Sequence, residues 1–147
     1  MLVLIRGAGD LASGVSLRLH RAGFPVVMTD LPKPTAIRRT VCFSQAIRFG
    51  TTMVEDAEGV CCHTAREVKA ALDAEKIPVL PDETAKCKDW LHPDVLVDGI
   101  LAKKNLGTKM SDAPLVIALG PGFCAGRDCH AVIETMRGHT LGRVIWD

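Results

Sequence analysis

The residues with the clearest chemical potential form a glycine-rich segment near the N-terminus. It reads Arg6-Gly-Ala-Gly-Asp-Leu-Ala12 and matches the pattern G-x-G-x-x-[G/A] through Gly7, Gly9 and Ala12. In this pattern the first glycine allows a tight turn and the second lets a phosphate approach the backbone, while a small third residue lets helix and strand pack closely. The helix that follows presents N–H groups and a positive dipole end. The segment predicts a nucleotide-phosphate site; the alternative is a tight turn that binds nothing.

Two carboxylates accompany this segment. Asp30 ends an apolar run about 20 residues further on, where an acidic residue accepts a hydrogen bond from a ribose hydroxyl. Asp10 stands inside the glycine-rich segment, where its charge would repel a pyrophosphate unless the side chain points away. It either caps the helix or contacts a hydroxyl group of the ligand.

Later segments carry further groups that suit an anionic ligand. The adjacent arginines can hold a phosphate through bidentate hydrogen bonds, and lysines and glycines after later strands can approach the same ligand. These candidates are Arg38, Arg39, Lys103, Lys104, Asn105, Gly120 and Gly122. The alternatives are solvated surface charge for the basic residues and a flexible loop for the two glycines.

The six cysteines indicate buried, reduced thiols rather than a metal centre. They are Cys42, Cys61, Cys62, Cys87, Cys124 and Cys129, and none forms Cys-x-x-Cys. Their spacing, with the neighbouring histidines, matches no common zinc module. Since the N-terminus lacks the basic region and long apolar core of a signal peptide, we expect a cytoplasmic protein with free thiols.

Short apolar runs alternate with amphipathic stretches along the chain. This alternation favours a parallel sheet covered by helices on both faces. The expected buried strands are 2–6, 25–29, 77–80, 95–98 and 115–119. The expected helices are 11–22, a short one at 44–49, one capped by Thr64 that runs through Leu72, and one capped by Asp82 that ends at Leu91.

Two hairpins complete the expected fold. Residues 51–55 and 60–63 flank a turn at 56–59, and residues 131–135 and 142–146 form a second pair. A helix over 128–137 is the alternative for the tail; β-branched residues favour the hairpin. The sequence thus predicts a single Rossmann-like α/β domain over 1–147, with an inserted hairpin and a C-terminal hairpin.

A parallel sheet brings the ends of several strands to one edge. Gly7, Lys103 and Gly122 should therefore share a single cleft, although they are far apart in the sequence. The basic residues Arg6, Arg38, Arg39, Lys103 and Lys104 should make that cleft locally positive.

Composition narrows the classes of protein that this chain can belong to. It has 147 residues, 48% of them hydrophobic and 24% charged, which suits one folded domain and excludes a disordered or collagen-like chain. The net charge is only +1, which argues against a general nucleic-acid or anionic-membrane binder. No apolar stretch reaches the roughly 18 residues that span a membrane. Tyrosine is absent, so no tyrosine acts as an acid or base.

Four segments together resemble one family. They are Ile5–Leu11, Asp30–Thr40, Asp98–Asn105 and the stretch from Gly120-Pro-Gly-Phe through His130–Thr135 to Arg137–Val144. In this order they are similar to the YqeB-type accessory proteins of the selenium-dependent molybdenum hydroxylase system. The resemblance covers nearly the whole chain. Family members continue beyond the last of these segments, and they commonly carry Glu where this sequence has Asp30.

The resemblance implies a function in the maturation of molybdenum hydroxylases. It implies a selenium-dependent molybdenum hydroxylase as partner and the molybdenum cofactor, or a molybdopterin dinucleotide, as ligand. On that basis the pyrophosphate would lie at Gly7–Ala12, the ribose at Asp30, and further phosphate at Arg38, Arg39 or Lys103. The alternatives are an NAD- or NADP-dependent oxidoreductase, and a non-catalytic scaffold or chaperone that docks the hydroxylase. A homo-oligomer is compatible with each of them.

Overall fold

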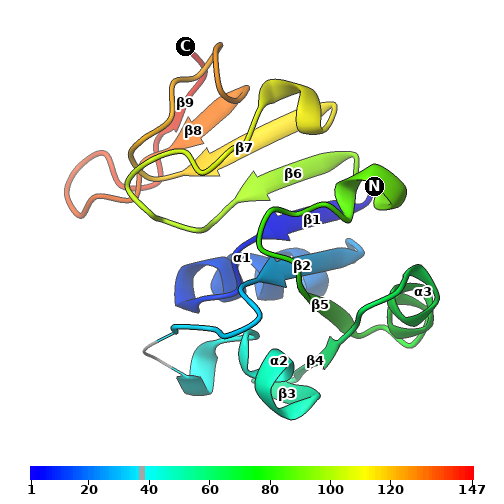
Figure 1. Cartoon of the computed structure of the whole chain (residues 1–147). Coiled ribbons are helices and arrows are strands. Elements are labelled where there is room, and N and C mark those ends of the chain that lie inside the picture. Colours follow the sequence, from blue (N-terminus) through cyan, green and yellow to red (C-terminus); the bar gives the residue numbers. More distant parts are fainter. Residues whose placement is uncertain (37–38) are drawn as a thin grey trace.

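A nine-stranded sheet organises the computed structural model, which describes residues 1–36 and 39–147 (Figure 1). Its order across the sheet is β3-β4-β5-β2-β1-β6-β7-β8-β9. The strands are β1 (Val3–Arg6), β2 (Val26–Asp30), β3 (Thr51–Val54), β4 (Ala57–Cys61), β5 (Ile77–Pro81), β6 (Val95–Asp98), β7 (Leu115–Leu119), β8 (Ala131–Ile133) and β9 (Val144–Ile145).

The helices are few and mostly short. The described α-helices are α1 (Asp10–Arg21), α2 (Gln45–Phe49), α3 (Ala65–Asp73) and α4 (Lys88–Leu91), with 3₁₀ turns η1 (Arg39–Val41) and η2 (Met110–Asp112). None of the helices in the described ranges is long and apolar enough to cross a membrane.

Most strand pairs are parallel, as predicted. The strand β1 pairs in parallel with β2 and β6, and parallel pairing continues outward to β4 on one side and to β8 on the other. Among the described strands, only the outermost pairs β3–β4 and β8–β9 are antiparallel. Both predicted hairpins are therefore present, but the first turn lies at residues 55–56 rather than 56–59, because β4 begins at Ala57. The alternative helix over 128–137 is wrong because residues 131–133 form β8.

The chain winds in two directions from the centre of the sheet. It passes from β1 to β2 and β5 on one side, and then crosses back to β6, β7 and β8 on the other. Neighbouring β1 and β6 are thus connected to strands on opposite sides, which makes a topological switch point. The arrowheads of β1, β6 and β7 point the same way in Figure 1, so their carboxyl ends share one edge.

Alternating residues of the central strands pack into separate hydrophobic clusters. Ile5 of β1 packs with Leu17 of α1 and with Phe43 before α2. Its neighbour Leu4 packs in the second cluster with Val68 of α3. Because successive strand residues point to opposite faces, the two clusters cover both faces of the sheet, as predicted.

The predicted helix from Asp82 to Leu91 is only partly correct. The Asp82 carboxylate does accept the backbone N–H groups of Lys86 (3.0 Å) and Cys87 (2.8 Å). However, Ala85 adopts a left-handed φ of 54°, which an α-helix excludes, so the helix is limited to Lys88–Leu91.

Candidate functional site

A cavity of about 830 Å³ lies at the carboxyl ends of β1, β2 and β6. Its wall consists of residues 6–12, 29–31, 83–84 and 99–101, together with Thr35, Ala36, Cys42 and Leu106. The wall therefore includes the glycine-rich segment and the acid that ends β2. Ligands of open α/β sheets bind at this position, outside the strand ends where the winding reverses.

The two glycines of the loop meet different requirements. Gly7 has a φ of +103°, and a Cβ placed on it would stand 2.9 Å from the carbonyl oxygen of Gly99. Gly9 has an ordinary φ of −74°, and a Cβ there would meet no heavy atom within 4 Å. The fold thus requires glycine at position 7, whereas at Gly9 there is free space for a side chain or a ligand atom next to the backbone.

Ala12 has the packing role that the sequence pattern predicts. A Cβ placed on Gly99, just after β6, would lie only 3.0 Å from the Cβ of Ala12. Helix α1 therefore approaches the end of β6 closely, and a larger residue at either position would separate them.

Asp30 is fixed by the backbone around it. Its Oδ2 accepts the N–H of Ala8 at 3.0 Å, and its Oδ1 accepts the N–H of Leu31 at 2.7 Å. Burial raises the pKa of the Asp30 carboxyl, and these two hydrogen bonds partly oppose that rise. The hydrogen bond from Ala8 joins this acid directly to the glycine loop.

Asp10 lies at the N-terminus of α1 and is exposed. Its Oδ1 accepts the N–H of the adjacent Leu11 at 2.9 Å. Its charge and that of Asp30 both reach Cys42, whose thiol has a pKa raised first by burial and then by these two carboxylates. Asp10 thus places negative charge on the cavity wall, beside the expected phosphate position.

The described residues of the cavity wall carry more acidic than basic side chains, and of the predicted bases they include Arg6 but not Lys103 or Lys104; the side chains of Arg38 and Arg39 are outside the described part of the chain. Three acidic residues line it, Asp10, Asp30 and Glu83, against the single described base Arg6. Arg6 is buried and already hydrogen-bonded within the protein. Among the described groups, backbone N–H groups and the dipole of α1 are available to a ligand phosphate.

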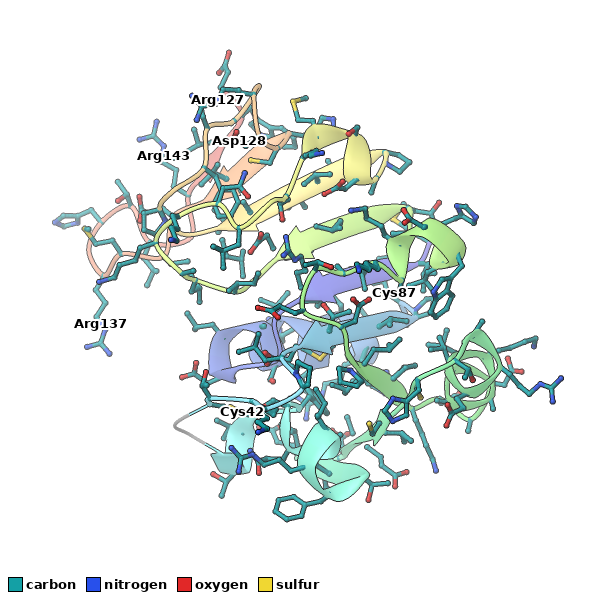
Figure 2. All side chains as sticks on the ribbon, viewed as in Figure 1. Cys42, Cys87, Arg127, Asp128, Arg137 and Arg143 are labelled. Atoms are coloured by element: carbon teal, nitrogen blue, oxygen red, sulfur yellow. The ribbon has the colours of Figure 1, made fainter. Side chains whose placement is uncertain are left out.

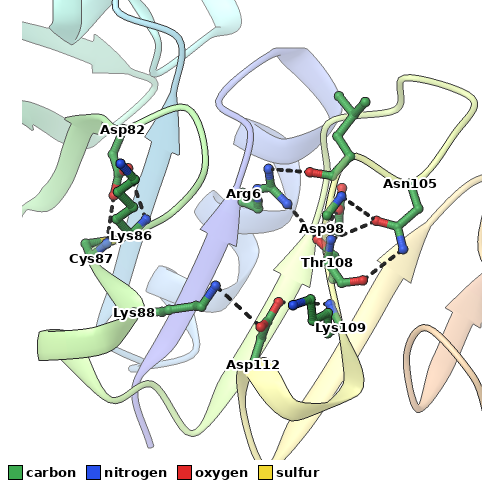
Figure 3. Close-up of polar contacts among 12 residues, drawn as sticks. Arg6, Asp82, Lys86, Cys87, Lys88, Asp98, Asn105, Thr108, Lys109 and Asp112 are labelled. Atoms are coloured by element: carbon green, nitrogen blue, oxygen red, sulfur yellow. Dashed lines mark hydrogen bonds and ion pairs between the residues drawn. The ribbon is translucent and has the colours of Figure 1, made fainter.

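Arg6 forms the centre of a buried polar network (Figure 3). Its guanidinium donates to Thr108 Oγ1 (2.9 Å), to the carbonyl of Leu106 (2.9 Å) and to the carbonyl of Glu83 (3.3 Å). The Thr108 hydroxyl in turn donates to Oδ2 of Asp98 at 2.6 Å. The network fixes the loop before η2 against the end of β1 and forms one side of the cavity.

The segment that contains Lys103 and Lys104 lies at the predicted edge of the sheet but outside the cavity wall. Gly122 packs on this segment, since a Cβ on it would lie 2.6 Å from Cα of Lys104. The shared edge is therefore confirmed, whereas the single cleft is not: the wall contains none of Lys103, Lys104, Asn105, Gly120 and Gly122. A Cβ on Gly120 would meet Leu101, which does line the cavity, at 2.8 Å.

Asn105 has a visible structural role. Its Oδ1 accepts the N–H groups of Gly107 (3.0 Å) and Thr108 (2.8 Å), and its Nδ2 donates to the Thr108 carbonyl (2.8 Å). The side chain thus closes the turn that Arg6 binds.

Among the predicted arginines, Arg38 lies outside the described residues, and the structure describes the backbone of Arg39, at the start of η1, but not its side chain.

All six cysteines are free, as predicted, but the prediction that they are buried is wrong for two of them: Cys61 is half-buried and Cys124 is exposed. Cys42 lines the cavity, whereas Cys87 lies in a separate part of the molecule (Figure 2). Within residues 1–36 and 39–147, no three or more His, Cys, Asp or Glu side chains gather in a way that could hold a metal ion.

Sequence reasoning missed several residues of the site. The sequence does not indicate that Thr108 and Asp98 form a network with Arg6, because Arg6 and Thr108 are 102 positions apart. The apolar wall formed by Ile100, Leu101 and Leu106 was also missed. The one available signal was the position of Asp98 at the end of an apolar run.

Together these features define an α/β protein with a glycine-loop cavity at the carboxyl edge of a mostly parallel sheet. Its sequence is 53% identical over 145 residues to the uncharacterized protein YqeB of Escherichia coli (strain K12), across 99% of this chain. The chain spans about a quarter, 27%, of the length of that relative. No family model matches the chain, and no solved structure matches it.

Proposed function

We propose that this chain is a Rossmann-like nucleotide-binding domain, over residues 1–147, that binds a dinucleotide-like anionic ligand at its glycine loop. The strands β5-β2-β1-β6-β7-β8 follow the spatial order 3-2-1-4-5-6 of dinucleotide-binding folds when numbered along the chain without the inserted hairpin. The cavity opens at the switch point of this order, where such folds bind their ligands.

One observation carries the proposal. The open surface of Gly9 lies on the cavity wall at the start of the 12-residue helix α1, next to an acid held by the same loop. A phosphate could approach the backbone of Gly9 there, beside the side chain of Asp10, and Asp30 stands where a ribose would follow.

The wider role that we propose is in the maturation of a selenium-dependent molybdenum hydroxylase in the cytoplasm. It is supported by the four-segment resemblance to YqeB-type accessory proteins and by the similarity to the YqeB relative. The ligand would then be the molybdenum cofactor in a dinucleotide form such as molybdopterin cytosine dinucleotide.

The described donor set suits the organic part of such a cofactor. The cavity has a volume typical of small-molecule sites and offers a phosphate approach at Gly9 and a hydroxyl acceptor at Asp30. The described residues provide no cluster of protein ligands for a metal. The nucleotide and pterin would therefore be what the protein holds.

A docking role is the second candidate. Four large apolar side chains are exposed on and around the C-terminal hairpin: Met136, Leu141, Val144 and Trp146. An exposed apolar surface of this kind suits contact with another protein. Because the chain also has a cavity, docking of the hydroxylase would accompany ligand binding rather than replace it.

The test is a substitution that should preserve the fold but block ligand binding. In Gly9→Val the new side chain projects into open space, so the protein should fold normally but lose its ligand. Gly14→Val is the matched control, because a Cβ there also meets nothing within 4 Å and Gly14 does not line the cavity. Thermal shift with NAD, NADP, CTP, cytidine diphosphate and molybdenum cofactor measures binding, since a ligand of the folded state raises apparent stability.

We expect the wild type and Gly14→Val to be stabilised by the same ligand, and Gly9→Val to show no shift. An unchanged titration in a folded Gly9→Val protein would contradict binding at the glycine loop.

A further inference from the structure

We propose that the edge strand β3 pairs with β3 of a second copy of this chain, so that two sheets join into one across a two-fold axis at Thr52. The residues of β3 do not line the cavity, so the inference is independent of the proposed ligand and adds an interaction surface to the molecule. Figure 1 shows β3 beside α2, at the end of the sheet opposite to β9.

The outer edge of β3 offers backbone groups to a further strand. Cys61 donates its N–H to the carbonyl of Gly50 at 2.7 Å, so these two residues form a hydrogen-bonded pair of the β3–β4 ladder. Because hydrogen-bonded and non-hydrogen-bonded pairs alternate along an antiparallel ladder, the even-numbered residues of β3 also bond to β4, whereas Thr51 and Met53 turn their N–H and C=O groups outward. In the described part of the chain β3 is the last strand on this side, and the backbone hydrogen bonds made outside helices and strands do not involve Thr51 or Met53.

The strand β3 lacks the features that normally protect such an edge. Its sequence, Thr-Thr-Met-Val, contains no charged residue and no proline. Met53 is 56% exposed, and Phe49, just before the strand, is 75% exposed. The other edge strand, β9, has only two residues and directly follows the charged Arg143. The edge of β3 is therefore the one better suited to pairing.

The outward groups determine the register of a symmetric pair. Antiparallel pairing about Thr52 places Thr51 opposite Met53 of the second copy, and in both equivalent pairs the two residues exchange their N–H···O hydrogen bonds. The two copies of Thr52 then form the non-hydrogen-bonded pair on the axis, and directly opposed threonines are a favourable cross-strand pair. Because the two-fold axis closes the contact, it yields a dimer and not a fibre.

Charges at the two ends of β3 favour a second copy in this orientation. Arg48 precedes the strand, whereas Glu55 and Asp56 form the turn that follows it. Arg21 binds both of these acids, so the cluster at the turn keeps one net negative charge. Antiparallel pairing brings Arg48 of each copy toward the acidic turn of the other copy, so opposite charges meet at both ends of the contact.

Sedimentation equilibrium of the full chain tests the association. At concentrations from about 1 µM to about 100 µM, we expect the mean mass to rise toward that of two chains, as mass action requires. Met53→Lys should weaken the dimer at least about tenfold, because lysine on an edge strand opposes pairing and the axis brings the two charges together. Val144→Lys is the matched control: it places the same charge on the other edge strand, at a residue that is 45% exposed, and should leave the association unchanged.

Cross-linking tests the register. In a Cys124→Ser background, which removes the exposed native thiol, Thr52→Cys should give a disulfide-linked dimer with oxidised glutathione, which takes up the two electrons and two protons of the thiols. The opposed Cα atoms would lie about 4.5 Å apart, within the range of a disulfide. Thr51→Cys is the matched control, because the two copies of residue 51 are diagonal neighbours about 7–8 Å apart, and it should give little covalent dimer.

Each contrary outcome overturns a defined part of the inference. A chain that stays monomeric at every concentration would overturn it entirely, while the proposed ligand binding would stand. A dimer that survives Met53→Lys, or that dissociates only in Val144→Lys, would place the contact elsewhere. Equal cross-linking through Thr51→Cys and Thr52→Cys would contradict the register. Circular dichroism checks the fold of both lysine variants, and cross-linking through Thr52→Cys decides the matter if Met53→Lys does not fold.

Discussion

Burial sets the reactivity of individual thiols in this protein. It raises the pKa of Cys62 to about 11 and that of Cys87 to about 12, and both side chains lie in the second hydrophobic cluster. Cys124, by contrast, is exposed. Since the thiolate is the reactive form, a disulfide reagent at about pH 8 should modify Cys124 first in the native protein and all six cysteines after denaturation.

The variant Cys124→Ser identifies the fast thiol. It should remove the rapid phase of labelling and leave the slow phases, including that of the half-buried Cys61, unchanged. A rapid phase that persists in Cys124→Ser would show that Cys61 or one of the buried thiols is as accessible as Cys124. A count near zero in denatured, unreduced protein would contradict the free-thiol assignment.

The Asp30 carboxyl group should make the free energy of unfolding depend on pH. Its folded-state pKa lies above the unfolded value of about 3.9, because burial disfavours the charged form. Its contribution to stability is fully present below the unfolded pKa and is lost as pH rises through the folded pKa. Asp30→Asn lacks this loss, so the free energy of unfolding of the variant minus that of the wild type should increase with pH across this window.

Urea unfolding at a series of pH values between about 3.5 and 7 measures that difference. Titrations elsewhere in the molecule cancel when the two proteins are compared at the same pH. A difference that stays constant or decreases with pH would show that folding does not raise the pKa of Asp30.

The strand-to-helix turn at the glycine loop gives a prediction at the scale of the element. Gly7→Ala should destabilise the fold by about 1–3 kcal/mol or more, since its φ of +103° disfavours a side chain and its Cβ would stand 2.9 Å from Gly99. Gly9→Ala should change stability by less than about 1 kcal/mol, because its φ is ordinary and its Cβ meets nothing. Chemical denaturation of the two variants measures both values, and equal destabilisation would contradict the assigned roles.

Local pattern was sufficient to predict most elements. The strands β1, β2, β5, β6 and β7 coincide with apolar runs, and Thr64 caps α3 by accepting the N–H of Glu67 at 3.2 Å. An apolar run and a capping residue are each defined by residues that are close together in the sequence, so both can be recognised from the sequence alone. The helix expected from Asp82 to Leu91 failed because Ala85 has a left-handed backbone conformation that its residue type does not indicate.

At the scale of the whole molecule, residues far apart in the sequence decide the shape of the cavity. The glycine loop and Asp30 were predictable because the spacing of a strand–helix–strand unit is short and regular. The exclusion of Lys103 and Gly122 from the cavity wall was not, because it depends on how the loop after β6 folds over the sheet edge. That loop is fixed by hydrogen bonds from Arg6, which join segments about 100 residues apart, and by the local turn that Asn105 closes.

The network of Arg6, Thr108 and Asp98 connects the ends of β1 and β6 to this loop. The Thr108 hydroxyl accepts from Arg6 and donates to Asp98, and the three residues are buried. Thr108→Val keeps the shape of the side chain but removes one hydrogen-bond partner from each of two buried charged groups, Arg6 and Asp98. We expect it to lower the free energy of unfolding by about 2–3 kcal/mol, measured by urea denaturation.

The variant Thr108→Ser distinguishes the contribution of the hydroxyl to stability from that of the methyl group. It keeps both hydrogen bonds and loses one buried methyl group, so the loss of stability should be only about 1 kcal/mol. Because Arg6 and Leu106 also line the cavity, Thr108→Val should loosen that side of the wall and weaken any nucleotide bound there, whereas Thr108→Ser should not. If Thr108→Val is as stable as Thr108→Ser, the hydroxyl contributes nothing, and packing alone positions the loop at the cavity edge.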